Sequence, residues 1–326
     1  MAATLEIENL TLSLVGGRGE PVDVVIGVDL AIERGRTHAL VGESGSGKSL
    51  TSLAVLGLLP PAIEIRSGVV RLGDDDLRRA GPARLRGIRG RRIGVVFQEP
   101  MTALNPLLPI GEQIAETLVA HGLMGWAAAR ARAVELLTLV GIPAAAERAG
   151  EYPHRFSGGM RQRVMIAIAI ACEPELLIAD EPTTALDVTM QAQILDLLGK
   201  LRDERGLALL FITHDLALVS EFADDVSVMY AGRIVERAAA ADLFGRPRHP
   251  YTAGLLGSLP RVEASPGGRL PVIPGDVPRP EQRPAGCAFH PRCGHPARDE
   301  TCGRAVPAFR HDGGRWVACA KTSAAG

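Results

Sequence analysis

The stretch that decides the fold is GESGSGKS at residues 42–49, which fills every fixed position of the pattern GxxxxGK(S/T). A short apolar run, THALV at residues 37–41, comes before it and is typical of a buried strand. Residues 49–59 follow with the length and the apolar spacing of a helix. Strand, glycine-rich loop and helix in this order predict the opening unit of an α/β nucleotide-binding fold.

The residue types in this stretch suit the binding of a phosphate chain. Glycines let successive backbone N–H groups turn inward, and the helix that follows presents its positive N-terminus. Lys48, one of only three lysines in the chain, supplies a positive charge for the β- and γ-phosphates, and Ser49 places a hydroxyl on Mg²⁺. A glycine-rich surface turn is the alternative, which the strand–loop–helix context disfavours. The predicted phosphate site comprises Gly42, Ser44, Gly45, Gly47, Lys48 and Ser49.

A second chemical motif is LLIADE at residues 176–181, an apolar strand that ends in two acids. Buried carboxylates are costly unless they meet a cation or a polarised water. We predict that Asp180 orients Mg²⁺ through its waters and that Glu181 acts as general base on an attacking water. An ordinary strand end with solvated carboxylates is the alternative, and the glycine-rich loop upstream argues against it.

Further polar residues lie where a nucleotide site would need them. Ser157 is a natural N-cap for an apolar helix, and Gly158 and Gly159 expose backbone donors at this second positive helix terminus. Gln98 and His214 each follow a predicted strand, at the strand ends where open α/β sheets bind ligands. A lone glutamine or histidine is more often a structural polar group, so the inference rests on the position of both residues at the ends of predicted strands.

The pattern along the chain predicts a large domain at residues 1–245 and a loop-rich appendage at 246–326. A helical subdomain is expected at about 105–172, because alanine, leucine and glutamate recur there at helical spacing. Nine of the 23 prolines lie between residues 246 and 284, which predicts no regular secondary structure there. Strands are predicted at 4–14, 22–32, 69–72, 93–97, 175–179 and 208–213, a hairpin at 226–236, and helices at 110–149, 158–172 and 189–204.

Composition restricts the function classes. The net charge is −1, but residues 246–326 hold twelve basic and six acidic residues, so that residues 1–245 are net acidic. Aromatic residues make up 4% of the chain, and a nucleic-acid groove with interleaved aromatics is not expected. No apolar run reaches the length of a membrane span, and the first residues lack the layout of a signal peptide, so we expect a cytosolic chain.

The motifs together resemble the ATP-binding subunit of an ABC transporter, and the resemblance covers essentially the whole chain. The matching motifs are the Walker A loop at Gly42–Ser49, the Q-loop at Gln98, the signature at Ser157–Met160, Walker B at Leu176–Glu181, the D-loop at Ala185-Leu186-Asp187 and the switch histidine His214. The resemblance implies an α/β, ABC-type P-loop ATPase domain with a helical insert, which binds ATP and Mg²⁺.

The resemblance also implies roles for individual residues. Glu181, His214 and Gln98 would be catalytic, and Ser49, Gln98 and Asp180 would hold Mg²⁺. Such proteins dimerise head to tail, so that Ser157, Gly158 and Gly159 of one chain, together with Asp187, would contact the nucleotide on the phosphate loop of the other. Met160 replaces the glutamine usual at the end of the signature, and residues 21–30 offer no aromatic side chain to stack on adenine.

Three segments narrow the resemblance to oligopeptide and dipeptide importer ATPases: FQEPMTALNP at 97–106, HPYTAGLL at 249–256 and GCAFHPRC at 286–293. The implied partners are two membrane-spanning permease subunits, a second related ATPase subunit and an extracytoplasmic solute-binding protein, with no nucleic acid. The implied location is the cytoplasmic face of the cell membrane. Nickel and glutathione importers are similar to this subfamily and stay open as alternatives.

Two rival functions are weighed against this interpretation. A soluble ABC ATPase acting on nucleic acid would need a basic groove, and it would usually carry two cassettes or a long coiled coil, which the sequence lacks. A catalytically inactive module is disfavoured because Glu181, His214 and Ser157 are all present.

The apolar segment 101–108 directly after Gln98 predicts a docking site for a cytoplasmic helix of a membrane subunit. The alternative is that these residues pack the core of the helical insert.

Four of the five cysteines lie in the appendage, with 5, 8 and 16 residues between them. A proline-rich segment with so little apolar surface needs a covalent or metal staple, and disulfides are disfavoured in the cytosol. Zinc sites usually pair cysteines more closely, whereas an iron–sulfur cluster tolerates wider spacing, and similar importer ATPases include members with a [4Fe–4S] centre here. We expect a structural [4Fe–4S] cluster, with zinc and free thiols as alternatives, on Cys287, Cys293, Cys302 and Cys319.

Overall fold

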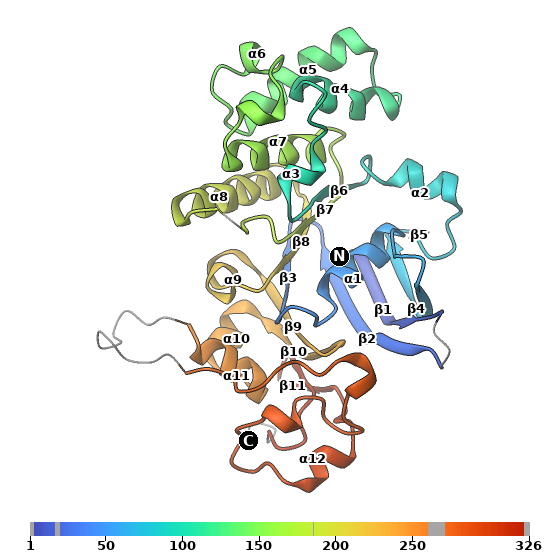
Figure 1. Ribbon diagram of the computed structural model, residues 1–326, viewed down its shortest axis with the longest axis vertical. Helices are drawn as coiled ribbons and strands as arrows, with labels where there is room; N and C mark the ends of the chain where they lie inside the picture. The colour runs from blue at the N-terminus through green and yellow to red at the C-terminus, as the bar shows by residue number, and fades with distance from the viewer. Residues whose placement is uncertain (1–2, 17–19, 185, 260–270, 323–326) are drawn as a thin grey trace. The chain divides into compact units, whose positions relative to one another are not determined.

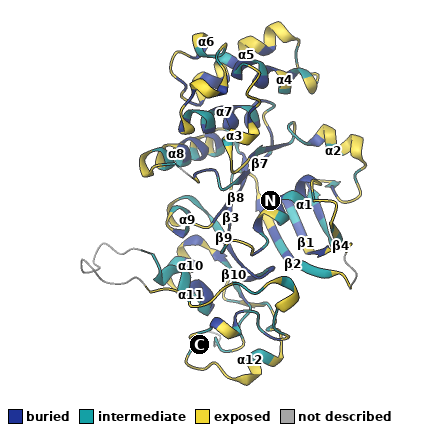
Figure 2. Ribbon diagram, viewed as in Figure 1, coloured by how far each residue is buried: buried dark blue, intermediate teal, exposed yellow. Residues whose placement is uncertain are grey.

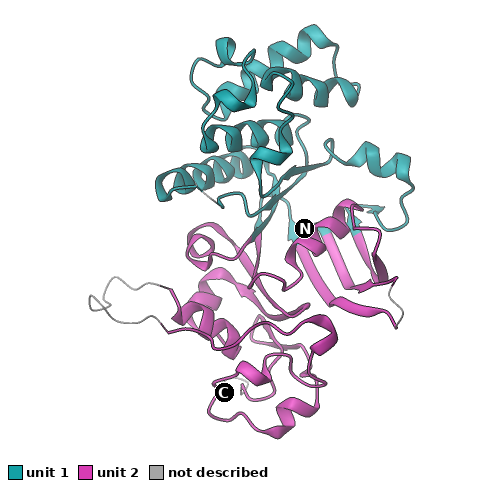
Figure 3. Cartoon of the chain, in the orientation of Figure 1, with its two compact units in different colours: residues 1–5, 32–37, 71–212 teal, residues 6–31, 38–70, 213–326 magenta. Residues whose placement is uncertain are grey.

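The computed structural model describes residues 3–16, 20–184, 186–259 and 271–322 (Figure 1). The chain forms two compact units, each assembled from segments that are distant in sequence (Figure 3). Unit 1 comprises residues 1–5, 32–37 and 71–212, and unit 2 comprises residues 6–31, 38–70 and 213–326. Among the described residues, no helix is both long enough and apolar enough to cross a lipid bilayer.

Unit 1 is built on three parallel strands. Strand β6 (Ile93–Val96) pairs with β7 (Leu176–Asp180), which pairs with β8 (Ala208–Thr213). Every residue of β7 and β8 except Asp180 is buried, as the colours of Figure 2 indicate. Such burial is typical of parallel strands, which helices usually cover on both faces. The short strand β5 (Asp75–Asp76) pairs with the end of β4 (Ile63–Leu72).

The helices of unit 1 include the predicted helical insert. Helix α4 packs on α5, and both contact α7, whose buried face is almost wholly apolar. The buried side chains of α4 and α5, among them Ile114, Leu118 and Leu136, form the core of this insert. The helices are α2 (Pro82–Ile88), α3 (Pro100–Ala103), α4 (Ile110–Ala120), α5 (Trp126–Leu139), α6 (Ala145–Arg148), the 3₁₀ turn η1 (Pro153–Arg155), α7 (Gly158–Ile170) and α8 (Val188–Arg205).

Unit 2 contains most of a sheet in the order β2-β1-β4, and a second set of strands. Strand β3 (Thr37–Val41) pairs in parallel with β9 (Asp225–Tyr230), and β9 pairs with β10 (Arg233–Ala239) in an antiparallel hairpin. Strand β12 (Arg315–Val317) extends this set, pairing with β10 and with β11 (Arg310–Asp312). The other elements are β1 (Ala3–Leu14), β2 (Val22–Glu33), α1 (Lys48–Leu56), α9 (Leu216–Phe222), α10 (Ala240–Gly245), α11 (Pro250–Gly257), η2 (Pro280–Gln282), η3 (His290–Arg292) and α12 (Glu300–Arg304).

Buried contacts attach the C-terminal segment, which is the appendage at residues 246–326, to the hairpin of β9 and β10. The fully buried carboxylate of Glu236 in β10 accepts hydrogen bonds from the backbone N–H groups of Arg248 (2.8 Å) and His249 (2.9 Å). A carboxylate removed from water needs such donors. The rings of Tyr230, Tyr251 and Phe289 pack together, with centroids 4.6–5.3 Å apart.

The structure corrects the prediction that residues 246–284 contain no regular secondary structure. Helix α11 begins there with Pro250, at a first helical position where proline's missing N–H costs nothing. The imidazole of His249 caps this helix, because Nδ1 accepts a hydrogen bond from the N–H of Tyr251 at 3.1 Å. Strand β4 also begins six residues earlier than predicted, at Ile63, while α2, β11 and β12 carry no strong local pattern. Residues 260–270 lie outside the described ranges.

Gly94 in β6 tests how tightly α7 packs on the parallel strands. A Cβ atom added there would lie 2.2 Å from the carbonyl oxygen of Ala169 in α7, so the Gly94→Ala variant must push the helix away. We expect a loss of about 1–3 kcal/mol in the free energy of unfolding, measured by thermal or urea denaturation. Gly87→Ala in α2 is the matched control, because a Cβ atom added there would meet no atom within 4 Å outside the backbone of its own helix. We expect this variant to gain up to about 1 kcal/mol in the free energy of unfolding. Equal effects of the two substitutions would contradict this account.

Candidate functional site

The phosphate loop, residues 42–49, joins β3 to α1 and lies close against strand β9. Gly42 has a φ of 153°, and a Cβ atom added to it would lie 2.1 Å from the carbonyl oxygen of Met229. Gly47 has a φ of 109°, and its added Cβ atom would lie within about 3 Å of side-chain atoms of Met229 and Val25. Glycine is therefore required at both positions by backbone conformation and by space.

Lys48 is held inside the phosphate loop. Its side chain is 5% exposed, and Nζ donates hydrogen bonds to the carbonyl oxygens of Gly42 (2.7 Å) and Glu43 (3.1 Å). The backbone N–H of Gly232, in the turn after β9, donates to the carbonyl oxygen of Ser46 at 2.8 Å. The ammonium group and the loop thus stabilise one another, and the arrangement matches a cradle for an anionic phosphate chain.

The exposed side of the loop carries the remaining predicted residues. Ser44, Gly45 and Ser49 are exposed, and no atom lies within 4 Å of a Cβ atom added to Gly45. The exposed part of the loop therefore comprises Ser44 and Gly45, just before α1, and Ser49 in its first turn.

Glu181 and Gln98 come together in unit 1, at the ends of the adjacent strands β7 and β6. Gln98 Nε2 and Thr184 Oγ1 each donate a hydrogen bond of 3.0 Å to Glu181 Oε2. Glu181 has a φ of 48°, a conformation that is strained for residues other than glycine and that clusters at functional sites. Asp180, the last residue of β7, is half-buried and lies beside Ile212 of β8.

The residues of the predicted signature and D-loop also lie together in unit 1. Ser157 caps α7, its Oγ accepting a hydrogen bond from the N–H of Met160 at 3.4 Å, and Asp187 caps α8 in the same way. A Cβ atom added to Gly159 would lie 2.0 Å from a side-chain atom of Met190, so the starts of these two helices are in contact. Gly158 is exposed beside them. Ala185 lies outside the described ranges.

His214 lies between β8 and α9, and its side chain is exposed. The next residue, Asp215, caps α9 by accepting a hydrogen bond from the N–H of Ala217 at 2.9 Å. The phosphate loop and His214 belong to unit 2, whereas Gln98, Asp180, Glu181, Ser157 and Asp187 belong to unit 1.

Two residues far away in the sequence, Arg292 and Tyr251, contact the phosphate loop, and the sequence did not predict either contact. The guanidinium of Arg292 binds the carboxylate of Glu43, and the hydroxyl of Tyr251 accepts a hydrogen bond from the N–H of Glu43. The only sequence signal was an acidic residue inside a loop that binds anions, which calls for a cation nearby.

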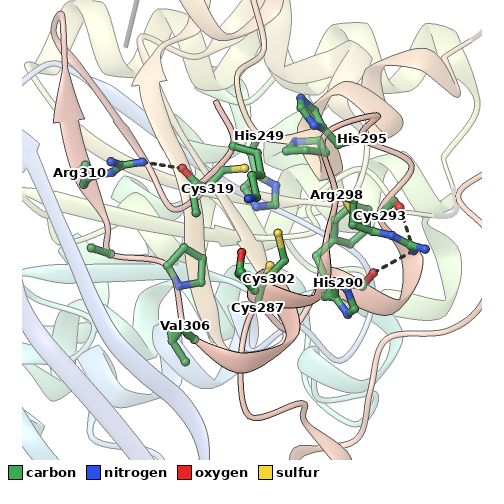
Figure 4. A pocket seen from close by; sticks show the side chains of 18 residues that line it. His249, Cys287, His290, Cys293, His295, Arg298, Cys302, Val306, Arg310 and Cys319 are labelled. Carbon is green, nitrogen blue, oxygen red and sulfur yellow. Dashed lines mark hydrogen bonds between the residues drawn. The ribbon is translucent and has the colours of Figure 1, made fainter. Parts of the chain in front are cut away.

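A cavity of about 350 Å³, here called the four-cysteine cavity, lies in the C-terminal segment of unit 2 (Figure 4). His249, Lys321, Arg298 and residues of α12 also line it. The segments around it are held by backbone contacts, including the N–H of Cys287 donating to the carbonyl oxygen of Cys302 at 2.8 Å. The cavity is named for Cys287, Cys293, Cys302 and Cys319, all of which line it.

The thiols of the four-cysteine cavity are partly buried and free of disulfide bonds. Burial raises the pKa of Cys287 and Cys293 above the usual thiol value, and neighbouring thiols add to the rise. Burial lowers the pKa of His249 to about 3, so this imidazole is neutral. In the part of the chain that the structure describes, no three His, Cys, Asp or Glu side chains are close enough to hold a metal ion, so the expected cluster gains no support there.

The fold and the phosphate loop together define a P-loop nucleotide-binding protein. The model of the ABC transporter family matches residues 25–184, and the model of the oligopeptide/dipeptide transporter C-terminal region matches residues 235–302. The chain belongs to the ABC transporter family, and it is an ATPase of the branch that carries this C-terminal region.

Relatives and solved structures agree with this assignment. The chain is 50% identical to the oligopeptide transport ATP-binding protein AppD of Bacillus subtilis, over 98% of this chain and 97% of that protein. It is 47% identical to the dipeptide transport ATP-binding protein DppD of the same organism, over 94% and 91%. The dimeric, post-hydrolysis structure of the ATP-binding cassette MJ0796 with ADP and Pi is 30% identical, with a TM-score of 0.64 over 72% of this chain and 98% of that one.

Proposed function

We propose that this chain hydrolyses ATP to power the import of oligopeptides or dipeptides through a membrane transporter. The observation that carries the proposal is the likeness, over nearly the full length, to proteins named for oligopeptide and dipeptide transport. The match of the C-terminal region, which extends beyond the ATPase cassette, supports the same substrate class.

The proposed assembly contains two membrane-spanning permease subunits, a second related ATPase subunit and an extracytoplasmic solute-binding protein. The chain would act at the cytoplasmic face of the membrane. In the dimer, Ser157, Gly158 and Gly159 of one ATPase would contact the nucleotide bound to the phosphate loop of the other, with Asp187 beside them. The exposed N-terminus of α7, with its backbone donors, supports this role.

The residues of the proposed ATP site have separate roles. The phosphate loop and Lys48 bind the β- and γ-phosphates, and His214 contacts the γ-phosphate. Mg²⁺, when bound, neutralises the charge that develops on the phosphates, and the residues that would hold it are Ser49, Gln98 and Asp180. Glu181 orients and deprotonates the attacking water, since two donors on its Oε2 fix the carboxylate in one direction.

Glu181→Gln should slow ATP hydrolysis by roughly 10²–10⁴-fold, because the general base is lost, while ATP still binds. Steady-state turnover and nucleotide-binding measurements separate the two effects, and a nucleotide-bound dimer should accumulate. Lys48→Ala is the contrasting variant and should weaken binding itself, because it removes contacts already made in the ground state. Turnover at the wild-type rate in the assembled Glu181→Gln complex would refute the assignment.

The segment after Gln98 supports a docking site for a permease subunit. Met101 and Leu107 are 65% and 80% exposed, whereas Leu104 is buried in the insert. The side chain of Gln113 holds the segment in place through three hydrogen bonds of 2.9 Å to the backbone of residues 105 and 108. A fixed, exposed apolar segment next to a proposed nucleotide sensor suits an apolar partner helix.

Leu107→Asp should abolish coupled transport, because a charge would be buried in the docking site, and leave the ATPase rate of the isolated subunit unchanged. Leu139→Asp, at an exposed leucine at the end of α5, is the matched control and should leave both activities intact. Transport assays in vesicles and ATPase assays on the subunit decide. Unfolding by Leu107→Asp, seen as a fall in melting temperature, would instead show that this leucine stabilises the insert, and it would contradict the docking role.

We also propose that the four-cysteine cavity holds a structural [4Fe–4S] cluster. The support is the donor set itself, since thiolates are the ligands of such clusters and four thiols surround one space. A cavity of about 350 Å³ lined by four cysteines has room for a group of several atoms. The basic surplus of the C-terminal segment would offset the negative charge of such a cluster.

Anaerobically purified protein should be brown, absorb near 400 nm and contain about four irons per chain. Cys302→Ser should lose the iron and the colour. Cys172→Ser is the control, because Cys172 lies in unit 1, where its thiol donates to the carbonyl oxygen of Thr117, and it should keep both. A colourless anaerobic preparation with one zinc per chain would assign the site to zinc.

A further inference from the structure

Arg292 joins the C-terminal segment to the phosphate loop across 249 residues of sequence. Its side chain is 6% exposed, and its guanidinium binds both carboxylate oxygens of Glu43 through Nη1 and Nη2, at 3.0–3.2 Å. The carbonyl oxygens of Ile273 and Pro274 accept two more of its hydrogen bonds. A guanidinium held on several sides is a rigid partner for a carboxylate.

Glu43 connects this ion pair to the groups that receive the phosphates. Its carbonyl oxygen accepts a hydrogen bond from Lys48 Nζ at 3.1 Å, and its N–H donates to the hydroxyl of Tyr251 at 3.0 Å. The side chain, the N–H and the carbonyl group of one loop residue are therefore all fixed. Two of these three contacts come from the C-terminal segment.

The charge of Glu43 is a difficulty for a loop that binds ATP. ATP is strongly anionic, and a carboxylate in the same loop repels it unless a cation offsets the charge. Arg292 supplies that cation at hydrogen-bond distance, from a side chain that is 6% exposed and faces a carboxylate side chain that is 31% exposed.

We propose that Arg292 is a positioning residue for ATP, which neutralises Glu43 and holds the phosphate loop in its binding conformation. The C-terminal segment thereby becomes part of the nucleotide site. This inference concerns ATP binding by the chain itself, so it stands whatever solute the transporter carries.

Arg292→Ala in the full-length chain should raise the Kd for ATP about tenfold or more, because Glu43 is left uncompensated, with kcat at saturating ATP close to wild type. Adding Glu43→Gln to this variant should restore most of the affinity, since the repelling charge is then absent. Glu43→Gln alone should bind ATP at least as tightly as the wild type. Titration calorimetry gives Kd, and the rate at saturating ATP gives kcat.

Arg315→Ala is the matched control. Arg315 is also nearly buried, at 11% exposure, and it pairs with Asp242 and donates to the carbonyl oxygen of Arg246, away from the phosphate loop. Its loss should lower the melting temperature and leave the Kd for ATP unchanged. Arg292→Lys keeps the charge but not the two-pronged geometry, and we expect an intermediate Kd.

Three results would overturn the proposal. The first is an unchanged Kd in folded Arg292→Ala, and the second is failure of Glu43→Gln to restore affinity, which would make Arg292 a packing residue only. The third is weaker ATP binding by Glu43→Gln alone than by the wild type, because the proposal predicts that removing the repelling charge does not lower the affinity. This comparison needs only the wild type and a variant that keeps Arg292, so it decides even where Arg292→Ala fails to fold.

Discussion

The phosphate loop is organised around the buried ammonium group of Lys48. A cation that is almost removed from water must find acceptors, and the carbonyl oxygens of Gly42 and Glu43 supply them. These two groups can reach one atom only because the chain turns back around the lysine, and the close approach of Gly42 to Met229 fixes the position of that turn. The loop is thus shaped by its own lysine, so less ordering remains to oppose phosphate binding.

The parallel strands and the polar residues that follow them can be predicted from the sequence, because both depend on local pattern. The strands β7 and β8 are apolar up to their last residues, Asp180 and Thr213, as is typical of strands covered on both faces. The hydrogen bond between Gln98 and Glu181 is compatible with the same pattern, since each residue comes after one of two adjacent strands. The strain at Glu181 is not visible in the sequence, because nothing local marks a glutamate for a left-handed conformation.

The contacts of the C-terminal segment could not be predicted, because they join residues far apart in the chain. Arg292 is one of 33 arginines, and no spacing rule links it to Glu43. The proline count gave a wrong prediction for α11, since Pro250 stands at a position where proline favours a helix. The cysteines show the same limit: their identity suggests ligands, but only the fold brings the four of them to one cavity.

Unit 2 is assembled from three separate segments of the chain, so the ribosome makes its parts at different times. The ribosome delivers Glu43 early, but its partner Arg292 is added 249 residues later. At about 5–20 residues per second, this delay is roughly 12–50 s, during which the loop's carboxylate has no guanidinium beside it. A nascent chain that already carries the complete phosphate motif therefore differs chemically from the folded subunit, because its loop acquires the Glu43–Arg292 charge balance only after Arg292 has been added.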